Sequence, residues 1–189
     1  LRRRSAGDVR FVFHQRVDFV GDGLVPASEL AAIDQVAYAR AMAKYDDTPE
    51  RRRLRETAIP GTGRSWTEVL FLNPVHPHAI WRAWREVWGK ELPRAEFWAV
   101  PAEDLPAGTV VLDRTVSAVG GPILPSEVVP FDAAGFATAR EVPPANRRWL
   151  EEMVRSGVSG AWFHGIPHVL VPGSVSLEHA QVIGWEEPI

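Results

Sequence analysis

The chain has 189 residues, of which 46% are hydrophobic and 24% are charged, and its formal net charge is −3 at pH 7. These values are typical of a folded globular domain and give no overall attraction to nucleic acid. The absence of cysteine excludes disulfides, thiolate zinc sites and cysteine nucleophiles. No apolar run approaches the roughly 20 residues of a membrane helix, and no secretory signal is recognisable, so we expect a cytoplasmic protein without membrane contact.

We expect residues 1–189 to form a single globular domain of the α+β class, with six or seven short strands in small mixed or antiparallel sheets and with flanking helices. The apolar patterns predict strands at residues 9–14, 66–72, 95–100, 110–113, 160–163, 168–171 and 182–185. Helical spacing predicts helices at residues 29–44, 78–89 and 144–156.

Residues 46–65 form a polar, arginine-rich stretch between the first helix and the second strand. Two prolines and two glycines interrupt it, which predicts a long loop with a single helical turn. The run from Arg51 to Arg55 is compatible with contact to a nucleic-acid backbone, although Glu50 and Glu56 at its ends favour a solvated segment.

Four histidines form two close pairs, His76 with His78 and His164 with His168. Neutral imidazole is a common zinc ligand, so a histidine–metal hydrolase is one alternative function. No carboxylate accompanies either pair at a recognisable ligand spacing, and we therefore predict no metal ligands. The sequence also lacks the serine-nucleophile, dinucleotide-binding and phosphate-loop motifs.

His14 ends the first predicted strand and is followed by Gln15 and Arg16. A histidine that leaves a strand beside a cation is suited to bind a ligand hydroxyl while the guanidinium meets a phosphate. A strand-end histidine that packs on the core explains the same pattern. Both interpretations remain open at this point.

The order of several segments is informative. A strand that ends in Phe13-His14 is followed by the helix entry Gly23-Leu24-Val25-Pro26, and later by a strand at residues 68–74 that leads into a helix. A strand pair within residues 95–114 comes next, and His168-Val169-Leu170-Val171-Pro172 precedes the last strand. In this order the segments resemble the ADP-ribosyltransferase-like domains over most of the chain.

The resemblance implies an NAD-consuming or nucleotide-handling enzyme with three catalytic positions. His14 would hold the ribose, and Trp81 would stack on nicotinamide, where the family more often has tyrosine. His168 stands at about the place of the family's catalytic glutamate. An imidazole is able to bind a hydroxyl or act as a base, but it cannot supply the same negative charge beside an oxocarbenium-like centre.

The resemblance further implies that Arg16, Trp66 and Asn73 contact the nucleotide. NAD, consumed as a substrate, or a related nucleotide is the expected ligand, and the sequence does not specify a protein or nucleic-acid target. ADP-ribosyl transfer, NAD glycohydrolysis and RNA 2′-phosphate transfer all remain open. A non-catalytic binding domain is the alternative from a different class.

Overall fold

The computed structural model describes residues 10–188 apart from 18–20, 115, 119 and 158–160. Its helices are α1 (Ala27–Ile33), α2 (Gln35–Ala43), α3 (Pro49–Leu54), α4 (Pro77–Trp88) and α5 (Pro144–Ser156), with short 3-10 helices at Trp66–Glu68, Ala102–Asp104 and Pro125–Glu127. Its strands are β1 (Phe11–Gln15), β2 (Gly23–Leu24), β3 (Ala58–Ile59), β4 (Arg64–Ser65), β5 (Leu70–Leu72), β6 (Glu96–Pro101), β7 (Val110–Leu112), β8 (Val128–Pro130), β9 (His168–Val171), β10 (Val175–Ser176) and β11 (Gln181–Gly184).

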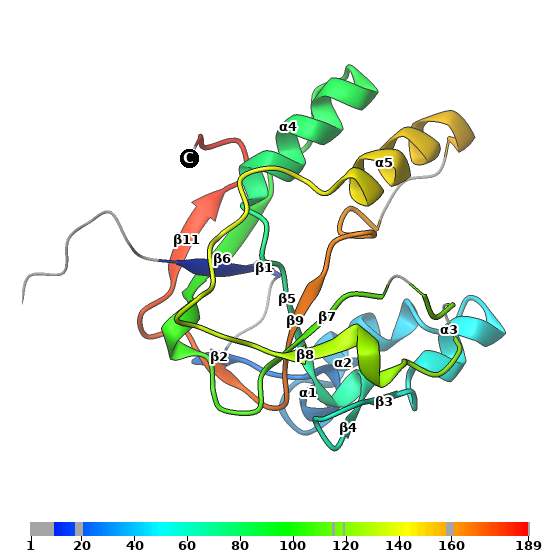
Figure 1. Cartoon of the computed structure of the whole chain (residues 1–189), viewed down its shortest axis with the longest axis vertical. Helices are drawn as coiled ribbons and strands as arrows, with labels where there is room; N and C mark the ends of the chain where they lie inside the picture. The colour runs from blue at the N-terminus through cyan, green and yellow to red at the C-terminus, as the bar shows by residue number, and fades with distance from the viewer. Residues whose placement is uncertain (1–9, 18–20, 115, 119, 158–160, 189) are drawn as a thin grey trace, which may run out of the picture.

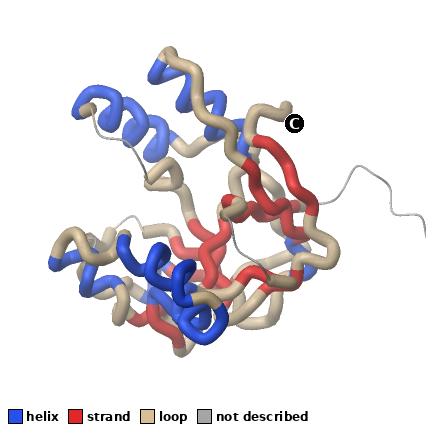
Figure 2. Tube along the Cα trace, turned by 180° about the vertical axis from the view of Figure 1, so that it is seen from behind, coloured by secondary structure: helices blue, strands red, loops and turns tan. Residues whose placement is uncertain are grey.

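The helices form two groups at opposite ends of the molecule. Helices α4 and α5 lie together at one end, α1, α2 and α3 lie at the other, and the larger sheets run between them (Figure 1, Figure 2). The chain is therefore of the α+β class, as its sequence predicts.

Two small antiparallel sheets form the centre of the fold. One has the strand order β1-β6-β11, and the other has the order β5-β9-β7-β8. An antiparallel bridge between Phe13 and Asn73 joins them: Phe13 N–H donates to the Asn73 carbonyl at 2.8 Å, and Asn73 N–H donates to the Phe13 carbonyl at 2.7 Å. The prediction of small antiparallel sheets is thus confirmed, but the described residues form eleven strands, several of only two residues, in place of the six or seven expected.

Strand β1 separates two hydrophobic clusters, because alternate side chains of a strand point to opposite faces. Phe13 packs on one face with Trp84 of α4 and Leu150 of α5. Val12 packs on the other face, with side chains of the second sheet such as Leu72. By the same alternation, His14 lies on the Val12 face, away from α4 and α5.

Helix α4 follows its prediction closely. Pro77 occupies its first turn, where a missing N–H costs nothing. The His76 imidazole accepts the N–H of His78 at 3.2 Å and so caps the helix. Gly89 ends the helix with a φ of 69°, a backbone conformation that favours glycine. The buried stripe that includes Trp84 then packs the helix on the sheet.

The single helix predicted at residues 29–44 is instead two helices, α1 and α2. Asp34 interrupts them with an extended backbone (φ −148°, ψ 102°). Its carboxylate accepts the N–H groups of Val36 and Ala37, each at 2.9 Å. Asp34 therefore caps a new helix, and this local bonding competes with continuation of the first one.

The loop predicted at residues 46–65 is also wrong in part, because the segment contains α3 and the β3–β4 hairpin. The Thr48 side chain caps α3 by accepting the N–H of Arg51 at 3.2 Å, and Pro49 is compatible with the first helical turn. The hairpin pairs Ala58 with Ser65. Cap and hairpin together give this arginine-rich segment a defined structure.

Two of the predicted strands need correction. In residues 66–72 only Leu70–Leu72 form a strand. The N–H and the hydroxyl of Ser65 both donate to the Glu68 carboxylate, each at 2.8 Å. These bonds start a 3-10 turn at Trp66–Glu68, which delays the start of the strand. Residues 161–163 of the strand predicted at 160–163 do not form a strand, and residue 160 lies outside the described residues.

Candidate functional site

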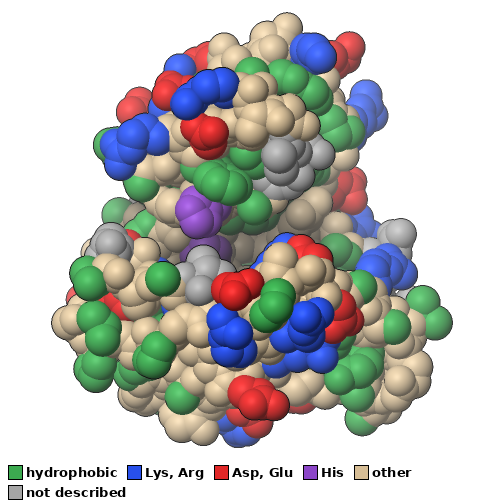
Figure 3. Space-filling model, turned by 90° about the vertical axis from the view of Figure 1, so that its right-hand side faces the viewer, with side chains coloured by type: hydrophobic (Ala, Val, Ile, Leu, Met, Phe, Trp, Pro, Cys, Tyr) green, Lys and Arg blue, Asp and Glu red, His purple; other side chains and the backbone are tan. Residues whose placement is uncertain are grey.

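The surface is hollowed between the end that carries α4 and α5 and the end that carries α1–α3, and histidine side chains are visible in the hollow (Figure 3). The backbone explains why histidines gather near the junction of the two sheets. Phe13, the residue before His14, bridges to Asn73. The β5–β9 register, continued by one residue, places Asn73 opposite His168. His14 and His168 therefore lie on the two strands that flank the end of β5.

His14 is held as a neutral imidazole of defined tautomer. Its Nδ1 lies 2.8 Å from the Gln15 carbonyl, which can only accept, so Nδ1 carries the hydrogen and Nε2 keeps a lone pair. Burial lowers the pKa of His14 to about 4, the Gln15 hydrogen bond partly offsets this, and Lys44 lowers it further. At neutral pH His14 is thus an uncharged hydrogen-bond acceptor.

His168 is the first residue of β9 and pairs with Leu112 of β7. Its ring meets Phe71 edge-on, with the centroids 5.8 Å apart. Burial lowers the pKa of His168 to about 4, a hydrogen bond to the Ile166 backbone raises it slightly, and His164 lowers it. His168 is therefore also neutral near pH 7, and a neutral imidazole has one ring nitrogen that accepts a hydrogen bond.

A row of aromatic side chains runs from His168 to the end of α2, and we call it the aromatic wall. We use this name for Tyr45, Trp66 and Phe71. The Trp66 indole N–H donates to the hydroxyl of the buried Tyr45 at 3.1 Å, and the Trp66 ring lies 4.6 Å from that of Phe71. Phe71 in turn contacts His168. The structure thus brings Trp66, one of the predicted nucleotide-binding residues, into the neighbourhood of His168.

Trp81 lies elsewhere. It belongs to the cluster between α4 and the Phe13 face of β1, opposite the face that carries His14. Its ring stacks on His78 with the centroids 5.2 Å apart, and the Arg85 guanidinium lies 5.0 Å from the ring centre. The structure therefore does not bring Trp81 together with His14, because the β1–β6–β11 sheet stands between them.

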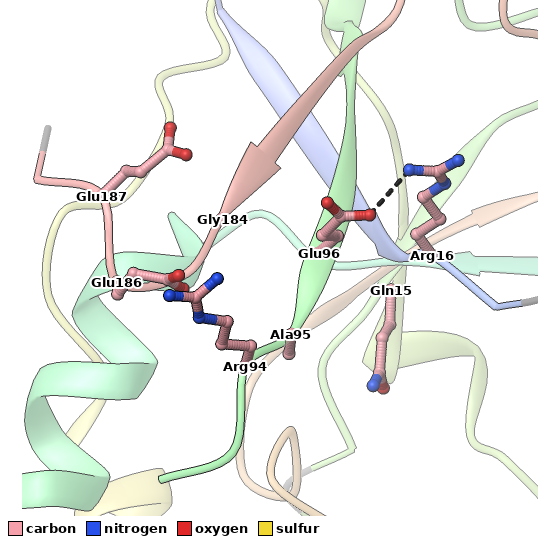
Figure 4. Close-up of a pocket in the computed structure, with 8 residues that line it drawn as sticks. All are labelled: Gln15, Arg16, Arg94, Ala95, Glu96, Gly184, Glu186 and Glu187. Atoms are coloured by element: carbon pink, nitrogen blue, oxygen red, sulfur yellow. Dashed lines mark hydrogen bonds and ion pairs between the residues drawn. The ribbon is translucent and has the colours of Figure 1, made fainter. Parts of the chain in front are cut away.

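Arg16 faces a different depression, of about 510 Å³, at the edge of the β1–β6–β11 sheet (Figure 4). Its guanidinium pairs with Glu96 at 2.6 Å and lies 5.4 Å from the centre of the Trp98 ring. The depression is lined by Gln15, Arg16, Arg94, Ala95, Glu96, Gly184, Glu186 and Glu187. Arg16 is thus engaged by a carboxylate in a polar depression, apart from the aromatic wall.

Asn73 lies at the junction, but its amide is already used. The side-chain N–H donates to the Val75 carbonyl at 2.8 Å, and the side-chain oxygen accepts the Val75 N–H at 3.1 Å. Asn73 is 6% exposed. Its role in this structure is to hold the turn after β5.

The remaining candidate groups serve the fold. His76 caps α4, and Nδ1 of His78 lies 3.2 Å from the Trp185 carbonyl. Within the described part of the chain, no three His, Cys, Asp or Glu side chains come together as a metal site would require. Arg51 and Arg53 pair with acidic neighbours at 2.6 and 3.1 Å, so the arginine run does not form a free basic surface.

Sequence reasoning missed Phe71 and Tyr45 as parts of the site. Alternation along residues 69–73 puts Phe71 on the same face as Asn73, a signal that was available. Tyr45 follows α2 and contacts Trp66, which lies 21 positions later in the sequence. A local sequence pattern does not predict such a contact.

Comparison with known proteins adds no assignment. No protein-family model, curated protein or solved structure matches this chain. Among the described helices, none has both the length and the apolar character needed to cross a membrane. The site therefore rests on its own geometry, which is a neutral His168 beside the aromatic wall and a neutral His14 on the strand across the end of β5.

Proposed function

We propose that this chain binds NAD or a related nucleotide in the hollow and cleaves the bond between nicotinamide and ribose, in the manner of an ADP-ribosyltransferase-like domain. The observation that carries the proposal is the position of His14 and His168, two neutral imidazoles on the strands that flank the end of β5. The segments that resemble this family include β1 and β6 of one sheet and β5 and β9 of the other, and the Phe13–Asn73 bridge joins these two sheets.

Each group has a role that its chemistry allows. Nε2 of His14 accepts a hydrogen bond from a ribose hydroxyl, because Nδ1 is engaged by the Gln15 carbonyl. The flat rings of the aromatic wall offer stacking to a nicotinamide or a nucleobase. His168 accepts a proton from water or from a hydroxyl.

In the hydrolytic form of the reaction, a water oxygen bonds to C1′ of the ribose while the C1′–nicotinamide bond breaks. The electron pair of that bond leaves with nicotinamide. The water proton passes to the free ring nitrogen of His168 and then to solvent, so the products are nicotinamide and ADP-ribose. An imidazole with a pKa of about 4 is a weak base, and we therefore expect slow turnover.

A second function, nucleotide binding without catalysis, is favoured by one specific observation. The groups found against His168 are Phe71, Leu112, His164 and the Ile166 backbone, and none of them is a carboxylate. Without a nearby negative charge, the positive charge that develops on the ribose is less stabilised. Binding would then persist while cleavage is lost.

The deciding experiment measures nicotinamide release from NAD by chromatography, together with ADP-ribose binding by calorimetry. We expect the unmodified protein to release nicotinamide and His168→Ala to lose that release while it still binds ADP-ribose. His14→Ala should weaken the binding. His179→Ala is the matched control, since His179 is exposed and pairs with Asp104 at 3.0 Å.

The outcomes separate the two functions. Binding of ADP-ribose by the unmodified protein without any nicotinamide release supports the binding domain. Absence of both binding and release, in a protein with a cooperative melting transition, contradicts the nucleotide proposal altogether.

A further inference from the structure

The residues that lead into β9 form a turn at 161–166, which lies against α5. Two side chains of α5 hold it. The Asn146 amide donates to the carbonyls of Trp162 at 2.8 Å and His164 at 2.7 Å. The Trp149 indole N–H donates to the Ala161 carbonyl at 3.0 Å, and its ring lies 4.4 Å from the His164 ring.

The backbone of the turn at Gly165 lies so close to α5 that a side chain there would clash with the helix backbone. Gly165 has a φ of 78°, and a Cβ added there would lie 2.8 Å from the backbone of Ala145 and of Asn146. Ala161 also has a positive φ, of 51°, which is uncommon for a residue with a side chain. Three carbonyls, one ring contact and a close backbone approach thus fix the turn on the helix.

Asn146 is 0% exposed, and its side-chain oxygen has no hydrogen-bond partner among the described residues. A buried polar atom without a partner destabilises a fold. The favourable contribution of Asn146 therefore comes from the two bonds that its amide donates. Both bonds end on the turn that precedes His168.

We propose that Asn146 and Trp149 are positioning residues, which set the place of His168 at the start of β9 by clamping the turn at 161–166 onto α5. Only Pro167 separates this turn, which ends at the buried Ile166, from His168. His168 itself contacts the Ile166 backbone. A shift of the turn is therefore passed on to the first residue of β9.

The significance of this clamp for turnover rests on the proposed function, but the clamp itself is testable without it. The first measurement is the NMR titration of the His168 ring, assigned by comparison with His168→Gln. The variants are Asn146→Ala and Trp149→Phe. The Phe variant keeps an aromatic ring at this position and removes the indole N–H with its five-membered ring, so it is the milder change and serves as the test if Asn146→Ala does not fold.

We expect the pKa of His168 to rise by about one pH unit in Asn146→Ala, because a released turn lets water reach the ring. Trp149→Phe should change it in the same direction by less. Arg148→Ala is the matched control on α5, since Arg148 is exposed, and it should leave the titration unchanged. An unchanged His168 titration in both clamp variants overturns the proposal.

The second measurement is nicotinamide release. If the proposed function holds, Asn146→Ala lowers kcat by about tenfold and changes KM much less, because the nucleotide contacts remain while the base is displaced. A shifted titration in a protein that releases no nicotinamide supports the clamp and contradicts only the proposed function.

Discussion

Phe13 and Asn73 exchange two backbone hydrogen bonds, at 2.8 and 2.7 Å, and this residue pair joins the two central sheets. His14 follows Phe13 directly, and His168 lies opposite Asn73 when the β5–β9 register is continued. The relative position of the two histidines therefore depends on the turn that Asn73 organises.

The first prediction concerns Asn73→Ala. The change removes both side-chain bonds to Val75, a residue that is 1% exposed, and leaves its backbone groups without partners. We expect the free energy of unfolding to fall by about 1–3 kcal/mol. Urea denaturation measures it, with Gln181→Ala on the exposed side of β11 as the control. Equal stability of Asn73→Ala and the unmodified protein would mean that the turn does not need the amide.

The second prediction concerns stability at acid pH. Burial lowers the pKa of His14, His76 and His168 to about 4, below the ordinary value of 6.5. Between these values the unfolded chain binds more protons than the folded one, so stability is fully present above pH 6.5 and falls as the pH decreases to about 4. His14 and His168 each contribute at most about 3 kcal/mol to this loss, and the more exposed His76 contributes less.

Urea denaturation at pH 7 and pH 4.5 tests this expectation. His168→Gln does not titrate, so its stability should decrease less between the two pH values than that of the unmodified protein. The exposed His179→Gln should behave like the unmodified protein. An identical decrease in all three proteins would show that His168 titrates normally.

The third prediction concerns the pH dependence of turnover. An imidazole with an ordinary pKa would cause activity to rise near pH 6.5. Because burial lowers the pKa of His168 to about 4, we expect nicotinamide release to stay constant above pH 5.5 and to fall as the pH approaches 4. Initial rates at constant ionic strength measure this profile. A transition near pH 6.5 would contradict the lowered pKa of His168.

The fourth prediction concerns Glu127, which organises the loop after β7. Its carboxylate accepts the N–H groups of Val116 and Ser117 at 2.8 Å and of Leu124 at 3.0 Å, and these bonds lower its pKa to about 2. Stability from this group is present above pH 4.5 and is lost as the pH falls through about 2.

Glu127→Gln should therefore lower the melting temperature at pH 7, since an amide group does not accept all three bonds. The difference from the unmodified protein should shrink as the pH falls below 4.5. Glu91→Gln, at an exposed position, serves as the control. A difference that does not change with pH would assign the effect to packing instead of charge.

The elements that the sequence predicts best are those whose signals are local. Helix α5 has the predicted bounds, and β9 coincides with its prediction, because apolar spacing and a flanking proline or glycine act on neighbouring residues. Asp34 shows where this reasoning failed. An apolar pattern of helical period continues across it, but its side chain bonds to the backbone ahead and starts a second helix.

The site was less predictable, because its contacts are distant in sequence. The strand positions of His14 and His168 agree with their predictions, but the side of the sheet that Trp81 faces depends on how α4 docks. Arg16 was predicted from its position two residues after His14, but it lies just past the end of β1, and its guanidinium pairs with Glu96 of β6. Glu96 lies beside Arg16 because β1 pairs with β6, and a local sequence motif does not predict which strands pair.

The break at Asp34 has a consequence for local unfolding. Among their described residues, neither α1 nor α2 has a buried side chain, and Ile33 and Val36 beside the break are 56% and 70% exposed. Segments with little buried apolar surface open at a low free-energy cost while the rest of the protein stays folded. The amide protons of these two helices should exchange with solvent well before those of β6 or β9. Helices α1 and α2, which precede Tyr45, would then open before the central sheets.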